Sequence, residues 1–206
     1  MKINQTTFFN LLPKFDSVTK IESSYQKAEG LKSGPVLVLD DDPTGIQTVH
    51  GIPVYMSWDL DVMDQIFNKR ELAFIHTNTR AYSTEKVRSL LLELMQNALE
   101  VSAKTGLGFD IISRSDSTLR GHFPLETEVI RTAYEHGTGK KTDGEIIVPF
   151  FKEGGRITAN DVHYVLEGED CIPANETEFA NDPDFGYNHA DLKLYVEEKT
   201  KKFHKK

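Results

Sequence analysis

Five short runs of apolar residues set the pattern of this chain. They are PVLVLD (35–40), IPVYM (52–56), LAFIH (72–76), FDIIS (109–113) and EIIVP (145–149). Continuous apolar runs of this length are typical of strands that are buried on both faces, as in parallel sheets. The pattern therefore predicts five buried strands.

Helical periodicity appears between these runs. From residue 83 to 104, apolar side chains recur at helical spacing after Ser83 or Thr84, either of which is a suitable N-cap. Weaker helical patterns cover 60–69 and 123–136. Strands that alternate with helices predict an α/β fold: a doubly wound, mainly parallel sheet flanked by helices, with three layers and a Rossmann-like topology.

The length of 206 residues suits one α/β domain. We assign this domain to residues 34–198. Residues 1–33 are expected to form an N-terminal helical extension, with amphipathic stretches at Phe8–Leu12 and Val18–Leu31. The basic residues 199–206 are expected to form a solvated tail.

Composition and charge exclude several classes of protein. The chain is 38% hydrophobic and 27% charged, and no apolar run approaches the roughly 20 residues needed to cross a bilayer. The first residues do not resemble a secretory signal, so we expect a cytoplasmic protein without a membrane partner. A net charge of -8 disfavours nucleic acid as a partner. The single cysteine, Cys171, excludes an intrachain disulfide and a multi-cysteine metal site.

Four of the predicted strands are followed directly by polar loops that contain Gly, Asp or Arg. In an open parallel sheet, ligands bind outside the carboxyl ends of the strands. If the strands are parallel, all four loops therefore meet at one edge of the sheet. The loops are 40–51, 77–82, 113–122 and 149–158.

The loop SRSDSTLRGH has the most distinctive chemistry. Arg114 and Arg120 can each bind a carboxylate or phosphate through two donors, while Asp116, Ser117 and Thr118 can bind hydroxyls. The alternative is that Asp116 or Ser117 caps the next helix and the arginines pair with surface acids. A cap alone does not need two arginines in one loop, so we favour a binding site. His122 is expected to make a structural contact at the helix start.

The string DDDPTG follows the first strand. Three adjacent carboxylates repel one another unless Mg²⁺, polyol hydroxyls or an arginine binds them. Asp40 and Asp41 leave the strand end where a ligand would sit. Asp42, just before Pro43, fits an ordinary solvated turn better.

Two other motifs deserve comparison with this interpretation. The string VLVLDDDPTG also resembles the nucleophile motif of haloacid-dehalogenase-type phosphatases. In that motif Asp40 would be the nucleophile, Asp42 the acid/base, and Thr77 or Thr79 the later hydroxyl. That alternative lacks a downstream acidic pair for Mg²⁺ and leaves the two-arginine loop unexplained. The string GTGKKT (137–142) is not a P-loop, because Tyr134 stands where the first glycine is required.

Over residues 34–198 the chain resembles the N-terminal, substrate-binding half of the four-carbon acid sugar kinases. The strings that carry the resemblance are DDDPTGIQTVHG, TNTRA, SRSDSTLRGHFPLE, PFFKEGGRIT, HYVLEG and IPANETEFANDPDFGY. The resemblance implies ATP-dependent phosphorylation of a terminal hydroxyl of a threonate, erythronate or oxo-tetronate. It further implies a substrate pocket without a metal site, lined by Asp40, Asp41, Thr44, Gly45, Arg80, Arg114, Asp116, Ser117, Thr118 and Arg120, with Gly155 and Arg156 as neighbours.

Members of that family bind ATP and Mg²⁺ in a second domain of comparable size, which lies beyond the part of the family that this sequence resembles. We therefore expect that this chain alone does not bind ATP tightly and that a separate nucleotide-binding half is a possible partner. A different class of function stays open as well: a stand-alone protein that binds a sugar acid and regulates without catalysis.

Overall fold

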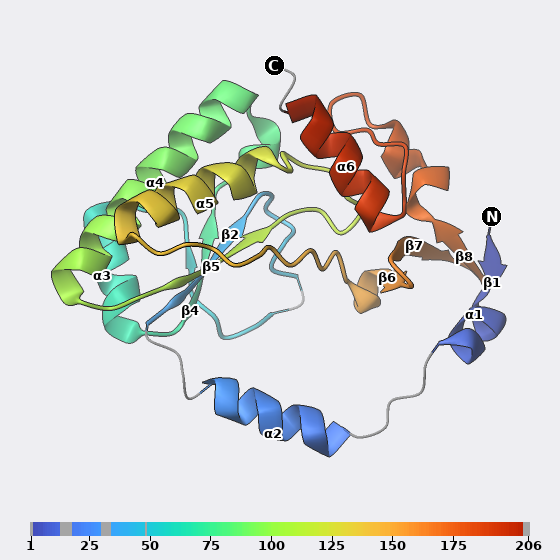
Figure 1. Cartoon of the computed structure of the whole chain (residues 1–206), viewed down its shortest axis with the longest axis horizontal. Helices are drawn as coiled ribbons and strands as arrows, with labels where there is room; N and C mark the ends of the chain where they lie inside the picture. Colours follow the sequence, from blue (N-terminus) through green and yellow to red (C-terminus); the bar gives the residue numbers. More distant parts are fainter. Residues whose placement is uncertain (1, 13–17, 30–33, 48, 204–206) are drawn as a thin grey trace.

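A four-stranded parallel sheet forms the centre of the protein (Figure 1). The computed structural model describes residues 2–12, 18–29, 34–47 and 49–203. The strand order is β3-β4-β2-β5, with bounds β2 Val36–Asp40, β3 Val54–Tyr55, β4 Leu72–His76 and β5 Asp110–Arg114. Four of the five predicted strands are therefore confirmed, together with their parallel arrangement.

The fifth predicted strand is wrong. Residues 145–149 form no strand and pair with none in the described chain, and Ile146 and Val148 are 89% and 69% exposed. The apolar pattern of this run indicates a preference for burial, but β5, the strand beside it, is not bonded to it.

Three helices pack against the parallel sheet and share one hydrophobic core with it. Their bounds are α3 Leu60–Lys69, α4 Thr84–Thr105 and α5 Leu125–Thr138. Leu37 and Leu39 of β2 contribute to this core because alternate residues of a strand face the same side. Ser83 caps α4 through its hydroxyl, as predicted. The structure confirms the predicted fold class, a mainly parallel α/β sheet flanked by helices.

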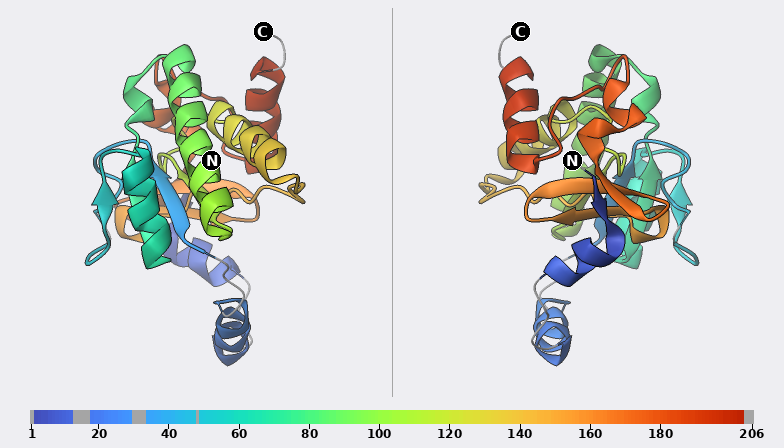
Figure 2. Two further views of the ribbon diagram at one scale, coloured as in Figure 1. Left: turned by 90° about the vertical axis from the view of Figure 1, so that its left-hand side faces the viewer. Right: turned by 90° about the vertical axis from the view of Figure 1, so that its right-hand side faces the viewer.

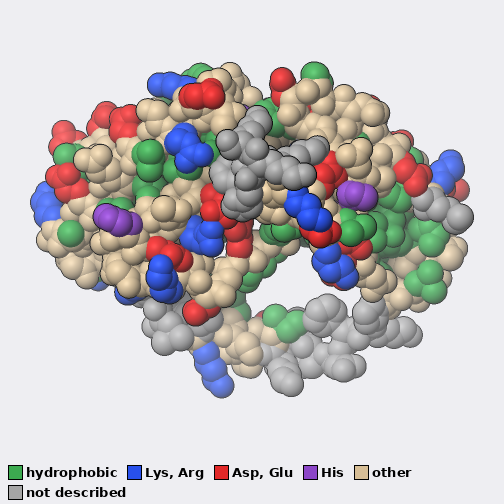
Figure 3. All heavy atoms as spheres, turned by 45° about the horizontal axis from the view of Figure 1, so that its top comes forward, with side chains coloured by type: hydrophobic (Ala, Val, Ile, Leu, Met, Phe, Trp, Pro, Cys, Tyr) green, Lys and Arg blue, Asp and Glu red, His purple; other side chains and the backbone are tan. Residues whose placement is uncertain are grey.

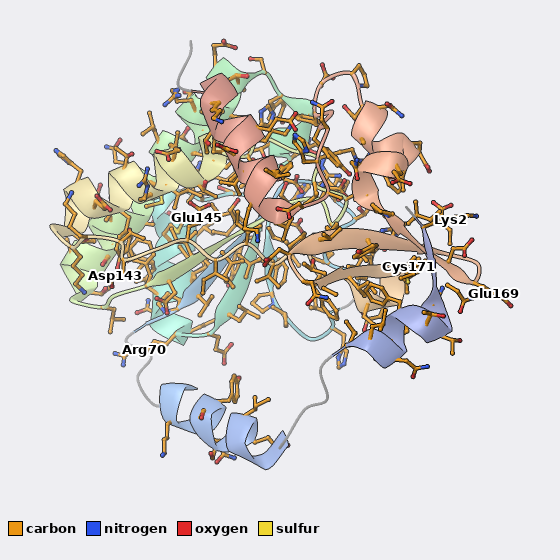
Figure 4. The ribbon with its side chains drawn as sticks, turned by 45° about the vertical axis from the view of Figure 1, so that its right-hand side comes forward. Lys2, Arg70, Asp143, Glu145, Glu169 and Cys171 are labelled. Carbon is orange, nitrogen blue, oxygen red and sulfur yellow. The ribbon has the colours of Figure 1, made fainter. Side chains whose placement is uncertain are left out.

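A second, antiparallel sheet was not predicted (Figure 2). Its order is β1-β8-β7-β6, with bounds β1 Ile3–Asn4, β6 Arg156–Ala159, β7 Val162–Glu167 and β8 Asp170–Pro173. Buried and less buried residues alternate along β7 and β8, which is the pattern of strands with one covered face. Gly168 has φ +58° in the tight turn between these two strands. Cys171 is fully buried in this region, beside Phe8 and Ile157 (Figure 4).

The remaining elements are short or terminal. They are α1 Gln5–Leu11, α2 Val18–Glu29, α6 Leu192–Phe203 and the 3₁₀ turns η1 Thr79–Ala81, η2 Lys152–Gly154, η3 Ala174–Glu176 and η4 Glu178–Asn181. Helix α2 lies apart from both sheets (Figure 1), and Leu31, where its amphipathic stretch was predicted to end, is outside the described residues.

Helix α6 includes the first residues of the stretch that was expected to be a tail. Lys199 donates to the carbonyls of Phe185 and Gly186, 3.0 Å from each, which fixes the helix against the preceding loop. Residues 204–206 lie outside the described part. Within the described ranges, no helix has both the length and the apolar character needed to cross a membrane.

Candidate functional site

The candidate site lies at the carboxyl end of the parallel sheet. Asp40 is the last residue of β2 and is in register with His76 of β4 and Arg114 of β5. The loops after these three strands therefore meet at one edge, as predicted. Acidic and basic side chains lie next to one another over the middle of the molecule in Figure 3.

Arginines from the neighbouring loops neutralise the three consecutive aspartates. Arg80 donates to both carboxylate oxygens of Asp41, from Nη2 at 2.7 Å and from Nε at 3.0 Å. Its Nη1 lies 2.5 Å from Asp42. Arg114 Nη1 donates to Asp40 at 3.1 Å. Arg80 and Arg114 thus pair with all three carboxylates.

Burial sets the electrostatics of this cluster. Asp40 and Asp41 are only 2% and 1% exposed. Burial raises the pKa of both carboxyls, and the arginine bound to each opposes that rise. Burial favours a higher pKa for Asp42 as well. Hydrogen bonds from Thr44 and the charge of Arg80 outweigh this effect and hold the pKa of Asp42 below its usual value.

Thr44 and Gly45 shape the loop that carries the aspartates. The Thr44 amide and hydroxyl both donate to Asp42, at 2.6 Å and 2.5 Å, and close a tight turn. Gly45 is buried against the Asp40–Arg114 pair. A Cβ at Gly45 would overlap both the carboxylate and the guanidinium, so only glycine fits there.

The loop at 113–122 folds back on itself. Arg120 Nε donates to Asp116 at 2.6 Å, and the Thr118 hydroxyl also donates to that carboxylate. Leu119 adopts a left-handed conformation, with φ +67°, and its amide donates to the Asp116 carbonyl at 3.0 Å. Asp116, Thr118 and Arg120, which were predicted as site residues, therefore form one local cluster.

Ser115 connects the two clusters and was not predicted. Its hydroxyl lies 3.1 Å from Asp41 Oδ2 and 3.0 Å from the Arg120 carbonyl. Gly121 has φ +127°, and a Cβ there would overlap the Ser115 hydroxyl. The only signal in the sequence was a serine between two charged residues, which is too common to indicate this role.

The predicted loops at 113–122 and 149–158 each place an arginine against the aromatic ring of Phe179. The guanidinium carbons of Arg120 and Arg156 lie 5.0 Å and 5.5 Å from the centre of the Phe179 ring. Gly155 precedes Arg156 with φ +72°, and Arg120 also lies 3.7 Å from Asp182. The sequence analysis quoted the string that contains Phe179 and Asp182 but did not assign either residue to the site.

A cavity of about 340 Å³ opens beside the loop at 113–122. Its polar lining includes Arg114, Ser115, Asp116, Ser117 and Arg120. Asp40, Asp41, Thr44, Gly45 and Arg80 do not line it, and neither do Thr118, Gly155 and Arg156. Only some of the predicted residues therefore border the cavity.

A comparison with known families matches most of the chain. Residues 36–205 match the family model described as a sugar-binding N-terminal domain, which covers the parallel sheet, strands β6, β7 and β8, and all loops of the site. The chain belongs to the four-carbon acid sugar kinase family. A search of the curated proteins found no match.

A buried acid that was not predicted also lines the cavity of this sugar-binding domain. Glu126, 5% exposed, accepts hydrogen bonds from Thr79 at 2.5 Å and from Ser113 at 3.0 Å. Burial raises the pKa of Glu126, and the two hydroxyl hydrogen bonds oppose the rise. Because Thr79 precedes Arg80, Glu126 joins the Arg80 turn to β5.

Two histidines have structural roles in the sugar-binding domain. His163 is fully buried, and its Nε2 lies 2.7 Å from the Ser117 carbonyl, which holds the backbone of the predicted site residue Ser117. Burial lowers the pKa of His163. His122 contacts the Tyr82 carbonyl at 3.1 Å and the ring of Phe185, in agreement with the structural contact expected for it.

Proposed function

We propose that this chain binds a four-carbon sugar acid of the threonate, erythronate or oxo-tetronate type, as the substrate-binding domain of an ATP-dependent kinase that phosphorylates a terminal hydroxyl. The family match supports sugar binding. The observation that carries the acid part of the proposal is the presence of Arg114 and Arg120 on one cavity wall, from one loop.

These two arginines keep donors for a ligand. In the described contacts, Arg114 uses Nη1 for Asp40, and Arg120 uses Nε for Asp116 with Nη1 near Asp182. A guanidinium has five N–H donors, so each retains several. A ligand carboxylate needs such donors, and the hydroxyls of a sugar acid suit the Asp116 carboxylate and the Ser117 hydroxyl.

We propose that ATP and Mg²⁺ take part in the reaction but are not bound tightly by this chain alone. Among the described residues, no group of three or more His, Cys, Asp or Glu side chains is arranged to hold a metal ion. We propose that a nucleotide-binding half supplies ATP and Mg²⁺, and that calorimetry will show no tight binding of ATP to this chain alone. Tight ATP binding would contradict this part of the proposal.

A thermal-shift assay tests sugar-acid binding directly. A ligand at a concentration of about 100 times its Kd stabilises the folded state by about 2.7 kcal/mol. For a chain of this size, each kcal/mol raises the melting temperature by about 2–4 °C, so the expected shift is roughly 5–11 °C. Threonate and erythronate are compared with erythritol, which lacks the carboxylate. We expect a shift with a sugar acid and a much smaller shift with erythritol.

Conservative variants locate the binding site. Arg120→Lys keeps the charge but cannot form a planar two-donor contact, so it should lose most of the ligand-induced shift. Arg131→Lys, at an exposed arginine on α5, is the matched control and should keep the full shift. Equal shifts with erythritol and the acids, or a full shift in Arg120→Lys, would contradict this site.

The geometry does not favour the phosphatase alternative. Asp40, its nucleophile, is buried and bound by Arg114, and the Thr77 hydroxyl donates to the Asp40 carbonyl rather than facing a substrate. Hydrolysis of p-nitrophenyl phosphate with Mg²⁺ that disappears in Asp40→Asn would support the phosphatase instead. A stand-alone binding protein would share the sugar pocket, and restoration of kinase activity by a nucleotide-binding half added in trans would argue against it.

A further inference from the structure

Three consecutive backbone carbonyls of the loop at 113–122 each accept a hydrogen bond from a buried side chain. The donors lie 46, 69 and 76 positions after the carbonyls that they contact. The contacts are His163 Nε2 to the Ser117 carbonyl at 2.7 Å, the Tyr187 hydroxyl to the Thr118 carbonyl at 2.8 Å, and the Tyr195 hydroxyl to the Leu119 carbonyl at 3.0 Å. Side chains from distant parts of the chain therefore fix this segment of backbone.

The donors belong to a different part of the fold from the loop. His163 is in β7 and Tyr195 is in α6, and both elements lie at the right of Figure 1, whereas β5, which leads into the loop, lies to their left. Tyr187 follows the 3₁₀ turn η4 and shares a hydrophobic cluster with Tyr195 and Leu119. The conformation of the loop therefore depends on packing in the part of the fold around the antiparallel sheet.

The backbone of Leu119 needs such support. Its φ of +67° is left-handed, which costs free energy for a residue that carries a side chain. A conformation of this kind persists only where the surrounding structure imposes it. Each carbonyl lies in one rigid plane with the next amide, so the three donors fix three consecutive peptide planes. The direction in which Arg120, the next residue, leaves the backbone is thereby fixed as well.

The fixed segment separates two polar residues of the cavity. Asp116 and Arg120 both line the cavity, and Arg120 Nε donates to Asp116 at 2.6 Å. Because Asp116 holds one nitrogen of Arg120, the direction of the remaining donors depends on this pair. Movement of residues 117–119 would displace one partner relative to the other. We therefore expect changes in this segment to alter ligand affinity, because affinity depends on how well the binding groups are preorganised.

His163 can hold its carbonyl in only one form of the neutral ring. A carbonyl only accepts hydrogen bonds, so Nε2 carries the proton that is donated to Ser117. Nδ1 is then an acceptor, and the Thr158 hydroxyl, 2.9 Å away, donates to it. Burial lowers the pKa of His163 and outweighs the hydrogen bond to Ser117, which favours the charged ring. His163 is therefore neutral at neutral pH, with its proton on Nε2.

We propose that the three side-chain donors are positioning residues, which hold Asp116 and Arg120 in the geometry that binds the sugar acid. This role rests on the proposed function, because it concerns how that site is prepared for its ligand. His163 and Tyr187 do not line the cavity, so they act through the backbone of residues 117–119.

Two substitutions of His163 test this role, because they differ in where they place a donor. Glutamine carries its amide nitrogen close to the position of Nε2 and keeps a donor for Ser117, whereas asparagine carries it close to the position of Nδ1. Calorimetry with threonate and with erythronate measures the Kd of the whole chain. The Kd of His163→Gln should stay within about twofold of the parent, and that of His163→Asn should rise about tenfold.

A control variant separates positioning from stability. Val101→Ala removes buried methyl groups from α4, in the core beside the parallel sheet. It should lower the melting temperature without a change in Kd, because the cavity that it leaves is remote from the loop at 113–122. A role of His163 in folding alone would make His163→Asn behave like this control.

Tyr195→Phe gives a second test in a variant that should keep its fold. It removes one hydroxyl and keeps the ring, which stacks on Phe123 with the ring centres 5.6 Å apart. The Kd should rise about tenfold, and the amides of residues 117–121 should exchange faster with solvent in the absence of ligand. Tyr164→Phe removes a hydroxyl from β7, on a ring that packs against Phe8, and should change neither quantity.

A spectroscopic measurement tests the form of His163 without any ligand. Nitrogen NMR with isotope-labelled histidine distinguishes a protonated ring nitrogen from an unprotonated one. The His163 signals are those that are missing from His163→Gln. They should show a protonated Nε2 and an unprotonated Nδ1 at neutral pH.

Three results would overturn the proposal. They are a protonated Nδ1 in His163, equal Kd values in His163→Gln and His163→Asn, and an unchanged Kd together with unchanged amide exchange in Tyr195→Phe. If the wild-type chain binds neither threonate nor erythronate, the proposed function fails. The NMR and exchange measurements then decide by themselves whether the three donors hold the loop.

Discussion

Removal of the Arg80 side chain tests whether the arginines of this site support the fold. Arg80→Ala leaves Asp41, whose side chain is 2% exposed, without its bidentate partner, and it also removes the contact with Asp42. Loss of one member of a buried ion pair costs about 3–5 kcal/mol, because the remaining charge stays buried and uncompensated. The melting temperature should therefore fall by roughly 6–20 °C.

The assay is urea unfolding at pH 7, followed by circular dichroism. Arg131→Ala is the matched control, because Arg131 pairs with Glu128 at the exposed surface of α5 and such pairs contribute about 0–1 kcal/mol. Asp41→Asn in the Arg80→Ala background removes the buried charge and should recover part of the loss. A decrease below about 1 kcal/mol in Arg80→Ala, or no recovery in the double variant, would refute the reasoning.

Three further variants test other parts of the site. In Glu126→Gln, the free energy of unfolding should be higher at neutral pH and should depend less on pH in the acid range. Because burial raises the pKa of Glu126, the folded wild-type chain keeps a proton that the unfolded chain has already released. Wild-type stability therefore falls as the pH rises from about 4.5 through the pKa of Glu126 in the folded chain. Gly45→Ala should cost about 1–3 kcal/mol by displacing Asp40, whereas Gly144→Ala, where an added Cβ meets no atom within 4 Å, should cost little in the same urea experiment. Tyr187→Phe should lower the free energy of unfolding by about 1–3 kcal/mol, because the buried Tyr187 hydroxyl donates to the Thr118 carbonyl at 2.8 Å. It should also reduce the thermal shift that the sugar acid causes. An unchanged shift would show that this hydrogen bond does not position the loop at 113–122.

The parallel sheet could be predicted because its strands are buried on both faces and read as continuous apolar runs. The antiparallel sheet could not be found in the same way, because in β7 and β8 burial alternates and the apolar residues are diluted by polar ones. The run at 145–149 has the composition of a buried strand but pairs with no strand in the described chain. An apolar pattern indicates which residues prefer burial, whereas pairing depends on which other strands lie within reach.

For the site, the sequence predicted the location better than the contacts. Loops after parallel strands must meet at one edge, so the convergence of Asp40, Arg80 and Arg114 followed from topology alone. Which arginine binds which carboxylate depends on loop geometry that no spacing encodes. Glu126 could not be identified from the sequence, because a glutamate in the first turn of a helix is common. Only its buried position, with hydrogen bonds to Thr79 and Ser113, reveals its role.

The ion pairs at this edge of the sheet indicate different roles for Arg80 and for Arg114 and Arg120. Arg80 directs all three of its nitrogens to two carboxylates and does not line the cavity, so it is not placed to bind a ligand there. Arg114 and Arg120 border the cavity and are 32% and 28% exposed, so they can add a ligand without giving up their partners. Substitution of Arg80 should therefore act mainly on stability, and conservative substitution of the other two mainly on ligand affinity. Of the predicted binding arginines, Arg80 thus holds the edge of the sheet together, whereas Arg114 and Arg120 keep donors for the proposed sugar acid.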